Sequence, residues 1–249
     1  MNRPAQMLSA EDMLYSQGFG TRRVCAGLIQ RGSLRVQGRV VADAGQPLAL
    51  DGLQFELDGE AWPYQAKAYL MLHKPEGTEC SQKPSAWPSV YTLLPAPLRQ
   101  RPVKGSAPGV QAVGRLDQDT TGLLLLSDDG TFIHRMSSPK RKQPKVYEVS
   151  LKHAATPALC QALLAGVQLV DERETLAAHA AELVAPQHLR LTLLQGKYHQ
   201  VKRMVAAAGN RVEGLHRSQI GQLKLDEALA PGHWRWLRPA DLAALDGQG

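Results

Sequence analysis

The sequence predicts an α+β fold in two domains. Segments with a strand pattern outnumber helical ones, and the connections between them vary in length, which argues against a regular βαβ array. The chain has 249 residues, which at roughly 100–200 residues per domain fits one or two domains. The hydrophobic pattern breaks around residues 58–63. We therefore expect a small N-terminal domain over residues 1–60, a linker over 61–66 and a larger domain over 67–249.

The N-terminal segment is typical of a helix followed by a hairpin. Thr21 is suited to cap a helix over residues 22–31, which Gly32 would end. Apolar residues on both sides of Gln37-Gly38 indicate two short strands joined by a tight turn. The predicted helix and hairpin carry five arginines: Arg22, Arg23, Arg31, Arg35 and Arg39.

The larger domain alternates strands and helices with one irregular stretch. Residues 79–112 are rich in Pro, Ser and Gly, and a long irregular segment of this kind is often functional. Apolar runs and alternation predict strands over 69–72, 123–126, 146–151, 189–193, 214–220 and 233–237. Caps and periodicity predict helices over 131–137, from Thr156-Pro157 to Gly166, over 199–208, and from Pro239 onward.

The composition excludes several classes of protein. Apolar residues make up 43% and charged residues 21%, as in an ordinary globular protein. No run approaches the roughly 20 apolar residues of a membrane span, and no signal peptide is evident at the N-terminus. Three scattered cysteines favour a reducing cytoplasm over a disulfide framework or a thiolate metal site.

Positive charge is concentrated in three stretches. The formal net charge is +6, and residues 1–42, 135–145 and 196–217 carry +4, +5 and +4. One such stretch is usually a solvated face, but three in a small protein favour a nucleic-acid partner.

The strongest candidate for chemistry is the segment from Gly114 to Gly122, which places Arg115 and Asp117 before the predicted buried strand. Both glycines would permit tight turns and the close approach of another backbone. A polar loop with a local Arg–Asp pair explains the same residues about equally well. Paired-carboxylate catalysis by Asp117 and Asp119 is less favoured, because adjacent carboxylates at a turn usually form the turn.

A second candidate segment runs over residues 197–204. If it is helical from about residue 199, Lys202 and Arg203 project on neighbouring faces, so that one could meet a carboxylate and the other a phosphate. His199 has no companion at zinc-ligand spacing, and the chain has neither a GxGxxG motif nor a P-loop. We therefore expect no metal.

Four stretches in order resemble the motifs of the pseudouridine synthases, within them the branch that modifies ribosomal RNA and carries an N-terminal S4-like RNA-binding domain. The stretches are Leu72-His73-Lys74-Pro75-Glu76-Gly77, Gly114-Arg115-Leu116-Asp117 with Thr121-Gly122-Leu123, Lys145-Val146-Tyr147, and residues 196–217 with Tyr198-His199-Gln200-Val201-Lys202-Arg203-Met204 and Leu215-His216-Arg217. The resemblance implies an S4-like α/β domain, then a catalytic domain built on a mixed, largely antiparallel sheet with flanking helices. The last stretch is most similar to the enzymes that act on 16S rRNA.

The resemblance also implies roles for individual residues. Asp117 would be the essential carboxylate, acting either as nucleophile on the ribose or as the base that starts elimination. Lys202 would be the cation that keeps Asp117 ionised, and Tyr147 would stack on the flipped uracil. Residues implied to bind substrate or RNA are Arg115, Leu215, Lys145, Arg203, Lys74, Arg22, Arg23 and Arg35.

The implied reaction breaks the N-glycosidic bond of a uridine, turns the base and joins C5 to the sugar. It involves no redox change and no group from outside, so no cofactor is expected. We expect a cytoplasmic monomer, away from any membrane, that acts on 16S rRNA or on a small-subunit assembly intermediate. The same reaction on 23S rRNA and a non-catalytic RNA-binding or assembly factor remain alternatives, and glycoside hydrolysis lacks a credible second carboxylate.

Overall fold

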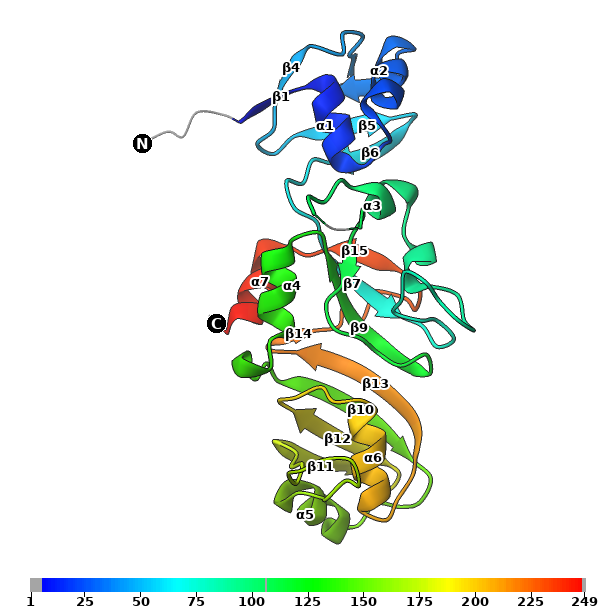
Figure 1. Cartoon of the computed structure of the whole chain (residues 1–249), viewed down its shortest axis with the longest axis vertical. Coiled ribbons are helices and arrows are strands. Elements are labelled where there is room, and N and C mark those ends of the chain that lie inside the picture. Colours follow the sequence, from blue (N-terminus) through cyan, green and yellow to red (C-terminus); the bar gives the residue numbers. More distant parts are fainter. Residues whose placement is uncertain (1–5, 106, 248–249) are drawn as a thin grey trace. The chain divides into compact units, whose positions relative to one another are not determined.

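The computed structural model describes residues 6–105 and 107–247, and the chain divides into two compact units (Figure 1). Unit 1 comprises Met1–Ala68, Leu94–Gln111 and Ser127–Asp129, and unit 2 comprises Tyr69–Leu93, Ala112–Leu126 and Gly130–Gly249. The predicted combination of a mixed sheet with helices is confirmed. Unit 1 also takes in two segments that the sequence pattern assigned to the second domain. No helix among the described residues has the length and apolar character to cross a membrane.

Unit 1 packs three helices against two small antiparallel sheets. The helices are α1 (Ala10–Gln17), α2 (Arg22–Gln30) and α3 (Ala96–Gln100). One sheet pairs β1 (Met7–Ser9) with β4 (Pro47–Ala49), and the other has the order β3 (Arg39–Val40), β2 (Leu34–Val36), β5 (Gln54–Leu57), β6 (Glu60–Pro63). Their core includes Met13, Leu14, Ile29, Leu34 and Phe55.

The predicted helix and hairpin of unit 1 are confirmed. The Thr21 hydroxyl accepts a hydrogen bond from the Val24 amide at 3.3 Å, and Gly32 follows the helix with a φ of +79°. The break in the hydrophobic pattern around residues 58–63 is a turn followed by a strand, whereas a linker was expected from residue 61. Asp58 and Gly59 have φ values of +51° and +85° and turn the chain into β6, whose Trp62 is buried in the core.

A buried arginine joins the separate segments of unit 1. The Arg101 guanidinium is almost fully buried and donates to an Asp128 carboxylate oxygen at 2.6 Å, to Gln17 Oε1 at 2.9 Å and to the Gln65 carbonyl at 2.6 Å. Asp128 also accepts from the Ala68 amide at 2.8 Å. Each group in this network therefore has a partner, as burial of charge requires.

We expect Arg101→Met to destabilise unit 1 by about 3–5 kcal/mol, because the substitution leaves the Asp128 carboxylate buried without its cation. Chemical denaturation followed by circular dichroism measures the change. Arg99→Met, at an exposed position of α3, the short helix that ends just before Arg101, is the matched control and is expected to change stability by less than about 0.5 kcal/mol. Equal effects of the two substitutions would contradict this role for Arg101.

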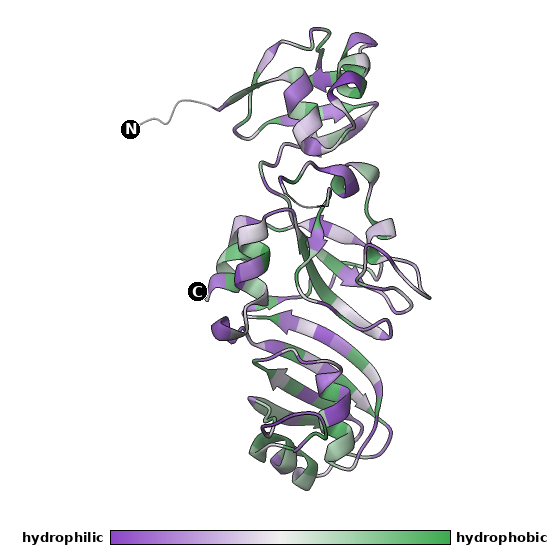
Figure 2. Ribbon diagram, in the orientation of Figure 1, coloured by the Kyte–Doolittle hydropathy of each residue, from purple (hydrophilic) through white to green (hydrophobic). Residues whose placement is uncertain are grey.

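Unit 2 is built on a nine-stranded mixed sheet. The order is β11 (Ala180–Ala185), β12 (His188–Leu193), β10 (Lys145–Leu151), β13 (Val212–Ile220), β9 (Thr120–Ser127), β7 (Tyr69–Lys74), β15 (Trp234–Trp236), with β14 (Leu223–Lys224) on β13 and β8 (Gln111–Ala112) on β9. β13 and β9 run parallel, whereas β10 with β12, β10 with β13, β11 with β12 and β7 with β15 run antiparallel. The alternation of hydrophobic and polar residues along β10 and β12 is visible in Figure 2.

Helices flank this sheet. They are α4 (Gly130–Ser137), α5 (Pro157–Ala165), α6 (Gln200–Ala207) and α7 (Pro239–Asp246), with short 3-10 turns at Val90–Leu93 and Pro139–Arg141. Phe132 of α4 and Leu245 of α7 pack with Leu123 and Leu125 of β9 in one core, and the two helices lie side by side in Figure 1. In β9 all residues except Thr121 are buried, as its apolar run predicts.

Gly122 permits the parallel pairing of β9 with β13. Its φ is +106°, and a side chain at this position would place Cβ only 2.3 Å from the carbonyl oxygen of Arg217. Gly122 and Arg217 are paired in the register of the two strands. The expected close approach of another backbone at this glycine is thus confirmed, and it fixes where Arg217 lies.

Candidate active site

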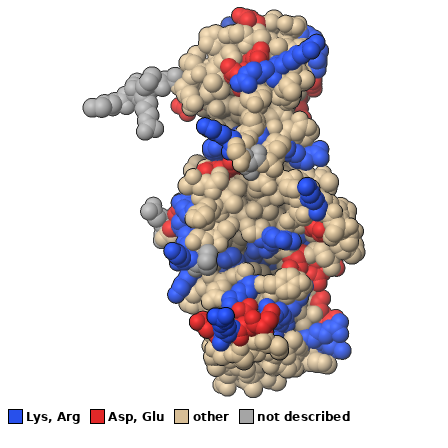
Figure 3. All heavy atoms as spheres, viewed as in Figure 1, with Lys and Arg blue, Asp and Glu red and all other residues tan. Residues whose placement is uncertain are grey.

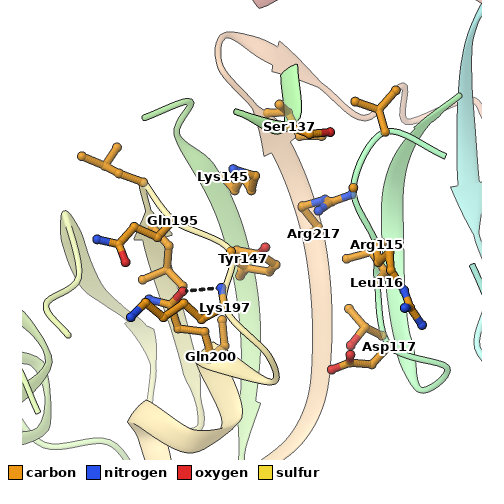
Figure 4. A pocket seen from close by; sticks show the side chains of 18 of the residues that line it. Arg115, Leu116, Asp117, Ser137, Lys145, Tyr147, Gln195, Lys197, Gln200 and Arg217 are labelled. Atoms are coloured by element: carbon orange, nitrogen blue, oxygen red, sulfur yellow. Dashed lines mark hydrogen bonds between the residues drawn. The ribbon is translucent and has the colours of Figure 1, made fainter. Parts of the chain in front are cut away.

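A pocket of about 340 Å3 lies in unit 2 against the central strands β9, β10 and β13 (Figure 4). This volume falls within the roughly 300–1,000 Å3 typical of small-ligand sites. Its walls come from residues 113–117 before β9, from the end of α4 at residues 136–138, and from residues 193–201 leading into α6. Asp117, Tyr147, Leu215, Arg115 and Lys145 all line it, so the structure brings five of the predicted site residues together.

Hydrogen bonds to the backbone hold the loop that carries Asp117. The Lys74 ammonium donates to the carbonyls of Pro75, Gln118 and Thr120 at 3.0, 3.2 and 2.9 Å. The Gly77 amide adds a bond to the Gln118 carbonyl at 2.9 Å. The loop that carries the Asp117 carboxylate is therefore held in place by hydrogen bonds to its backbone.

Lys74 does not fit the predicted direct contact with RNA. Its side chain is fully buried, and this burial lowers the pKa of its ammonium. Since its ammonium donates to three backbone carbonyls, Lys74 holds the loop that carries Asp117 and is not free to contact a phosphate.

Two side chains of the 199–202 segment face Asp117. Lys202 Nζ lies 3.4 Å from Asp117 Oδ2 and 2.6 Å from Asp119 Oδ1, and His199 Nε2 lies 3.4 Å from Asp117 Oδ1. Burial opposes ionisation of Asp119, but the hydrogen bond and charge of Lys202 hold its pKa below the ordinary value. The expected Lys202–Asp117 contact is present, and Asp119 shares the same cation at a shorter distance.

His199 is a site residue that the sequence analysis missed. It precedes Lys202 by three residues, which is close to one helical turn, and this spacing could have placed both beside the same carboxylate. His199 caps α6 with a φ of +45°, an uncommon conformation for a residue other than glycine. The adjacent Tyr198 ring is exposed and stacks on the His199 imidazole at 3.9 Å.

The floor of the pocket is formed by side chains on one face of β10 and β13. Tyr147 of β10 is buried and is paired in register with Arg217 of β13. Arg217 follows Leu215 by two residues on β13, so both side chains lie on the same face of that strand. An irregularity in the pairing between Val146 and Tyr147 shifts the register there. Bulges of this kind re-aim side chains beside active sites. Lys145, Tyr147, Leu215 and Arg217 consequently all reach the pocket.

Three further residues predicted to contact RNA, Arg115, Lys145 and Arg203, differ in their surroundings. Arg115 is exposed at the pocket, and its side chain makes no hydrogen bond or ion pair within the part of the chain that the structure describes. Lys145 is half-buried and donates to the Gln143 carbonyl at 3.2 Å. Arg203 lies outside the pocket lining and is paired with Asp171 and Glu172.

The three predicted RNA contacts of unit 1 are exposed. Arg22 and Arg23 begin α2, and Arg35 lies on β2. Arg22 pairs with Asp12 at 2.9 Å and Arg35 approaches Glu56 at 4.0 Å. Figure 3 shows Lys and Arg side chains on the visible surface of unit 1.

Both the sequence and the fold of this chain are similar to those of known proteins. Residues 68–207 match the family model described as RNA pseudouridylate synthase. A protein of Salmonella typhimurium named ribosomal small subunit pseudouridine synthase A is 38% identical over 94% of this chain and 98% of its own length, and its namesake from Vibrio parahaemolyticus is 40% identical over 87% and 90%. A solved structure titled crystal structure of pseudouridylate synthase has a TM-score of 0.66 and 32% identity, covering 96% of this chain and 99% of that one.

Proposed function

Because the chain belongs to the RNA pseudouridylate synthase family, we propose that it isomerises a specific uridine of 16S ribosomal RNA to pseudouridine. The choice of 16S rRNA rests on relatives named for the ribosomal small subunit, which match nine-tenths of this chain at 37–40% identity. The observation that supports the chemistry best is the Asp117 carboxylate beside Lys202, at a pocket floored by Tyr147.

The reaction requires the base to leave its stack, because its atoms cannot turn inside a helix. The Tyr147 ring would stack on the extruded uracil, a contact worth about 1–3 kcal/mol per base. Leu215, on the neighbouring strand, would close the other apolar side. Arg115 would hold the phosphate of the flipped nucleotide or fill the space that the base leaves, since it is exposed at the pocket.

Asp117 would supply the carboxylate that opens the glycosidic bond. As nucleophile it attacks the ribose, and as base it removes a ribose proton to start elimination; both roles require the ionised form. Lys202 would offset the negative charge of this carboxylate, because its ammonium lies within salt-bridge distance of both Asp117 and Asp119. After the base turns, C5 bonds to C1′ and the proton on C5 is lost while N1 gains one, so the net reaction exchanges no atom with a cofactor.

Unit 1 would supply affinity for RNA, as the S4-like resemblance implies. A triple variant, Arg22→Gln with Arg23→Gln and Arg35→Gln, is expected to reduce the slope of log K against log salt by up to about 2–3, because fewer counterions are released. Filter binding of a 16S rRNA fragment between low and high salt measures the slope. Substitution of these side chains is preferable to deletion of the N-terminal residues, because Gln17 and Gln65 share hydrogen bonds with Arg101 in the same unit. An unchanged slope would contradict the assignment of these arginines.

Mapping pseudouridines in ribosomal RNA tests the function directly. In a strain that lacks the gene, we expect one 16S position to lose its pseudouridine and to regain it when the wild-type gene is restored. Loss of a pseudouridine from 23S rRNA instead would show that the same reaction acts on the large-subunit RNA. An unchanged pseudouridine map together with an assembly defect would favour the non-catalytic RNA-binding alternative.

A further inference from the structure

Arg217 is a buried cation whose partners are incomplete. Its side chain is 3% exposed, and its Nε donates to the Leu123 carbonyl at 2.9 Å. Its Nη2 is fully buried and makes no hydrogen bond with any residue that the structure describes. A guanidinium keeps its charge at any physiological pH, so a buried donor without an acceptor is unfavourable unless a ligand provides one.

Two other arginines, the buried Arg101 and the partly buried Arg235, have more partners. Arg101 meets Asp128, Gln17 and Gln65, and Arg235 is paired with Asp226 and Asp241 at 2.8 and 2.7 Å. These two are held by complete sets of partners. Arg217 is instead part of the pocket wall, which indicates that its remaining donors serve a bound molecule.

The place of Arg217 in the sheet defines what it can reach. Arg217 and Tyr147 are direct partners in the register of β13 and β10, so their side chains project side by side from the same face. In Figure 4 Arg217 lies between Tyr147 and the loop that carries Arg115 and Asp117. A ring stacked on Tyr147 would therefore present its edge to the guanidinium.

A second cation makes the surroundings more positive. Lys145 lines the same pocket, and its pKa is lowered by burial and by the charge of Arg217. Asp117 is the one carboxylate among the lining residues, and it faces Lys202 and His199. The pocket thus favours a ligand that carries electron-rich oxygens.

We propose that Arg217 donates a hydrogen bond from its guanidinium to a carbonyl oxygen of the flipped uracil and stabilises the negative charge that the ring acquires during isomerisation. This inference rests on the proposed function. When the C1′–N1 bond breaks, its electron pair stays on N1 and is delocalised onto O2 and O4. A donor held in place before the reaction stabilises such a charge without reorganisation. Arg217 remains protonated throughout and exchanges no proton.

The symmetry of uracil strengthens this assignment. A half-turn about the N3–C6 axis exchanges N1 with C5, which is the change the reaction needs, and it also exchanges O2 with O4. One fixed donor can therefore meet a carbonyl oxygen before and after the base turns. A phosphate is a poorer match, because it stays near solvent whereas Arg217 is buried beside Tyr147.

The test combines enzyme variants with altered substrates. Wild type and Arg217→Met are assayed at saturating enzyme in single turnover on RNA whose target is uridine, 2-thiouridine or 4-thiouridine, since sulfur accepts hydrogen bonds weakly. With uridine, Arg217→Met is expected to be slower by about 10²–10³-fold. Each thio substitution is expected to slow the wild type by about tenfold, and to add less than threefold in Arg217→Met, because the donor is already absent.

Two results would overturn the proposal: a uridine rate in Arg217→Met within threefold of the wild type, or a thio effect of equal size in both enzymes. Arg235→Met, which removes a paired arginine outside the pocket, is the control and is expected to lower stability while its single-turnover rate stays within threefold. If Arg217→Met does not fold, Arg217→Leu, which also lacks a donor, replaces it in the same comparison with the same criteria. Wild type that is inactive on uridine RNA would instead contradict the proposed function.

Discussion

Asp117→Asn is expected to bind RNA with unchanged affinity and to lose isomerase activity by more than about 10³-fold. The amide is nearly the same size as the carboxylate, but it acts neither as nucleophile nor as base. The loop should keep its conformation, because Lys74 holds it through backbone carbonyls on each side of this residue. Release of tritium from RNA labelled at C5 of uridine measures the rate.

Asp119→Asn is the matched control for this substitution. Both carboxylates contact Lys202, and Asp119 is the nearer one, at 2.6 Å. Asp119 is exposed and does not line the pocket, so its amide variant is expected to lose less than about tenfold. The opposite order, with Asp119→Asn the more severely impaired, would move the catalytic role from Asp117 to Asp119.

Lys202→Met is expected to slow the saturated single-turnover reaction by about 10²–10³-fold at pH 7. Without the ammonium, Asp117 and Asp119 lose the cation that both contact, and the repulsion between two neighbouring carboxylates is no longer offset by it. Lys202 holds the pKa of Asp119 down, so its removal raises that pKa. The rate of the variant should therefore rise with pH more steeply than that of the wild type.

Lys202→Arg keeps the charge and is expected to stay within about tenfold of the wild-type rate, although the guanidinium differs in shape from the ammonium. The pH profile of the saturated rate is measured for both variants, together with the salt dependence of RNA binding. If Lys202 serves only a phosphate, Lys202→Met will bind RNA more weakly and react at the wild-type rate once saturated. That pattern would rule out its role beside Asp117.

Local signals predicted most of the elements. The helix capped by Thr21, the helix that begins at Pro157 and the buried strand over Leu123–Leu126 each combine periodicity with a terminal signal, and each is present. Helix α3 was missed because it is a five-residue element inside a Pro-rich stretch, and Pro95 at its N-cap position provides no side-chain cap. Strand β11 was missed because its mostly exposed residues, rich in alanine, pair only with β12 and show no alternation.

The sequence also predicted some features of the site and not others. Asp117, Tyr147 and Leu215 follow from motif position, and the structure brings them to one pocket. The burial of Lys74 and of Arg217 could not be predicted from the sequence in this way. Lys74 is enclosed because β7 is internal to the sheet, and the unpaired donor of Arg217 depends on the approach of β13 to Gly122. Both facts arise from pairing between strands distant in the chain, which a local pattern does not encode.

Unit 1 is assembled from three separate segments of the chain, and this has a consequence for its folding during synthesis on the ribosome. Gln17 and its partner Arg101 are 84 residues apart, and Asp128 follows Arg101 by another 27. At roughly 5–20 residues added per second, the buried arginine emerges about 4–17 s after the helix that it joins. Although its amino terminus is made first, this unit cannot complete its polar network until more than half of the polypeptide has been translated. A nascent chain arrested before Asp128 should therefore be more sensitive to protease in this region than one arrested beyond it.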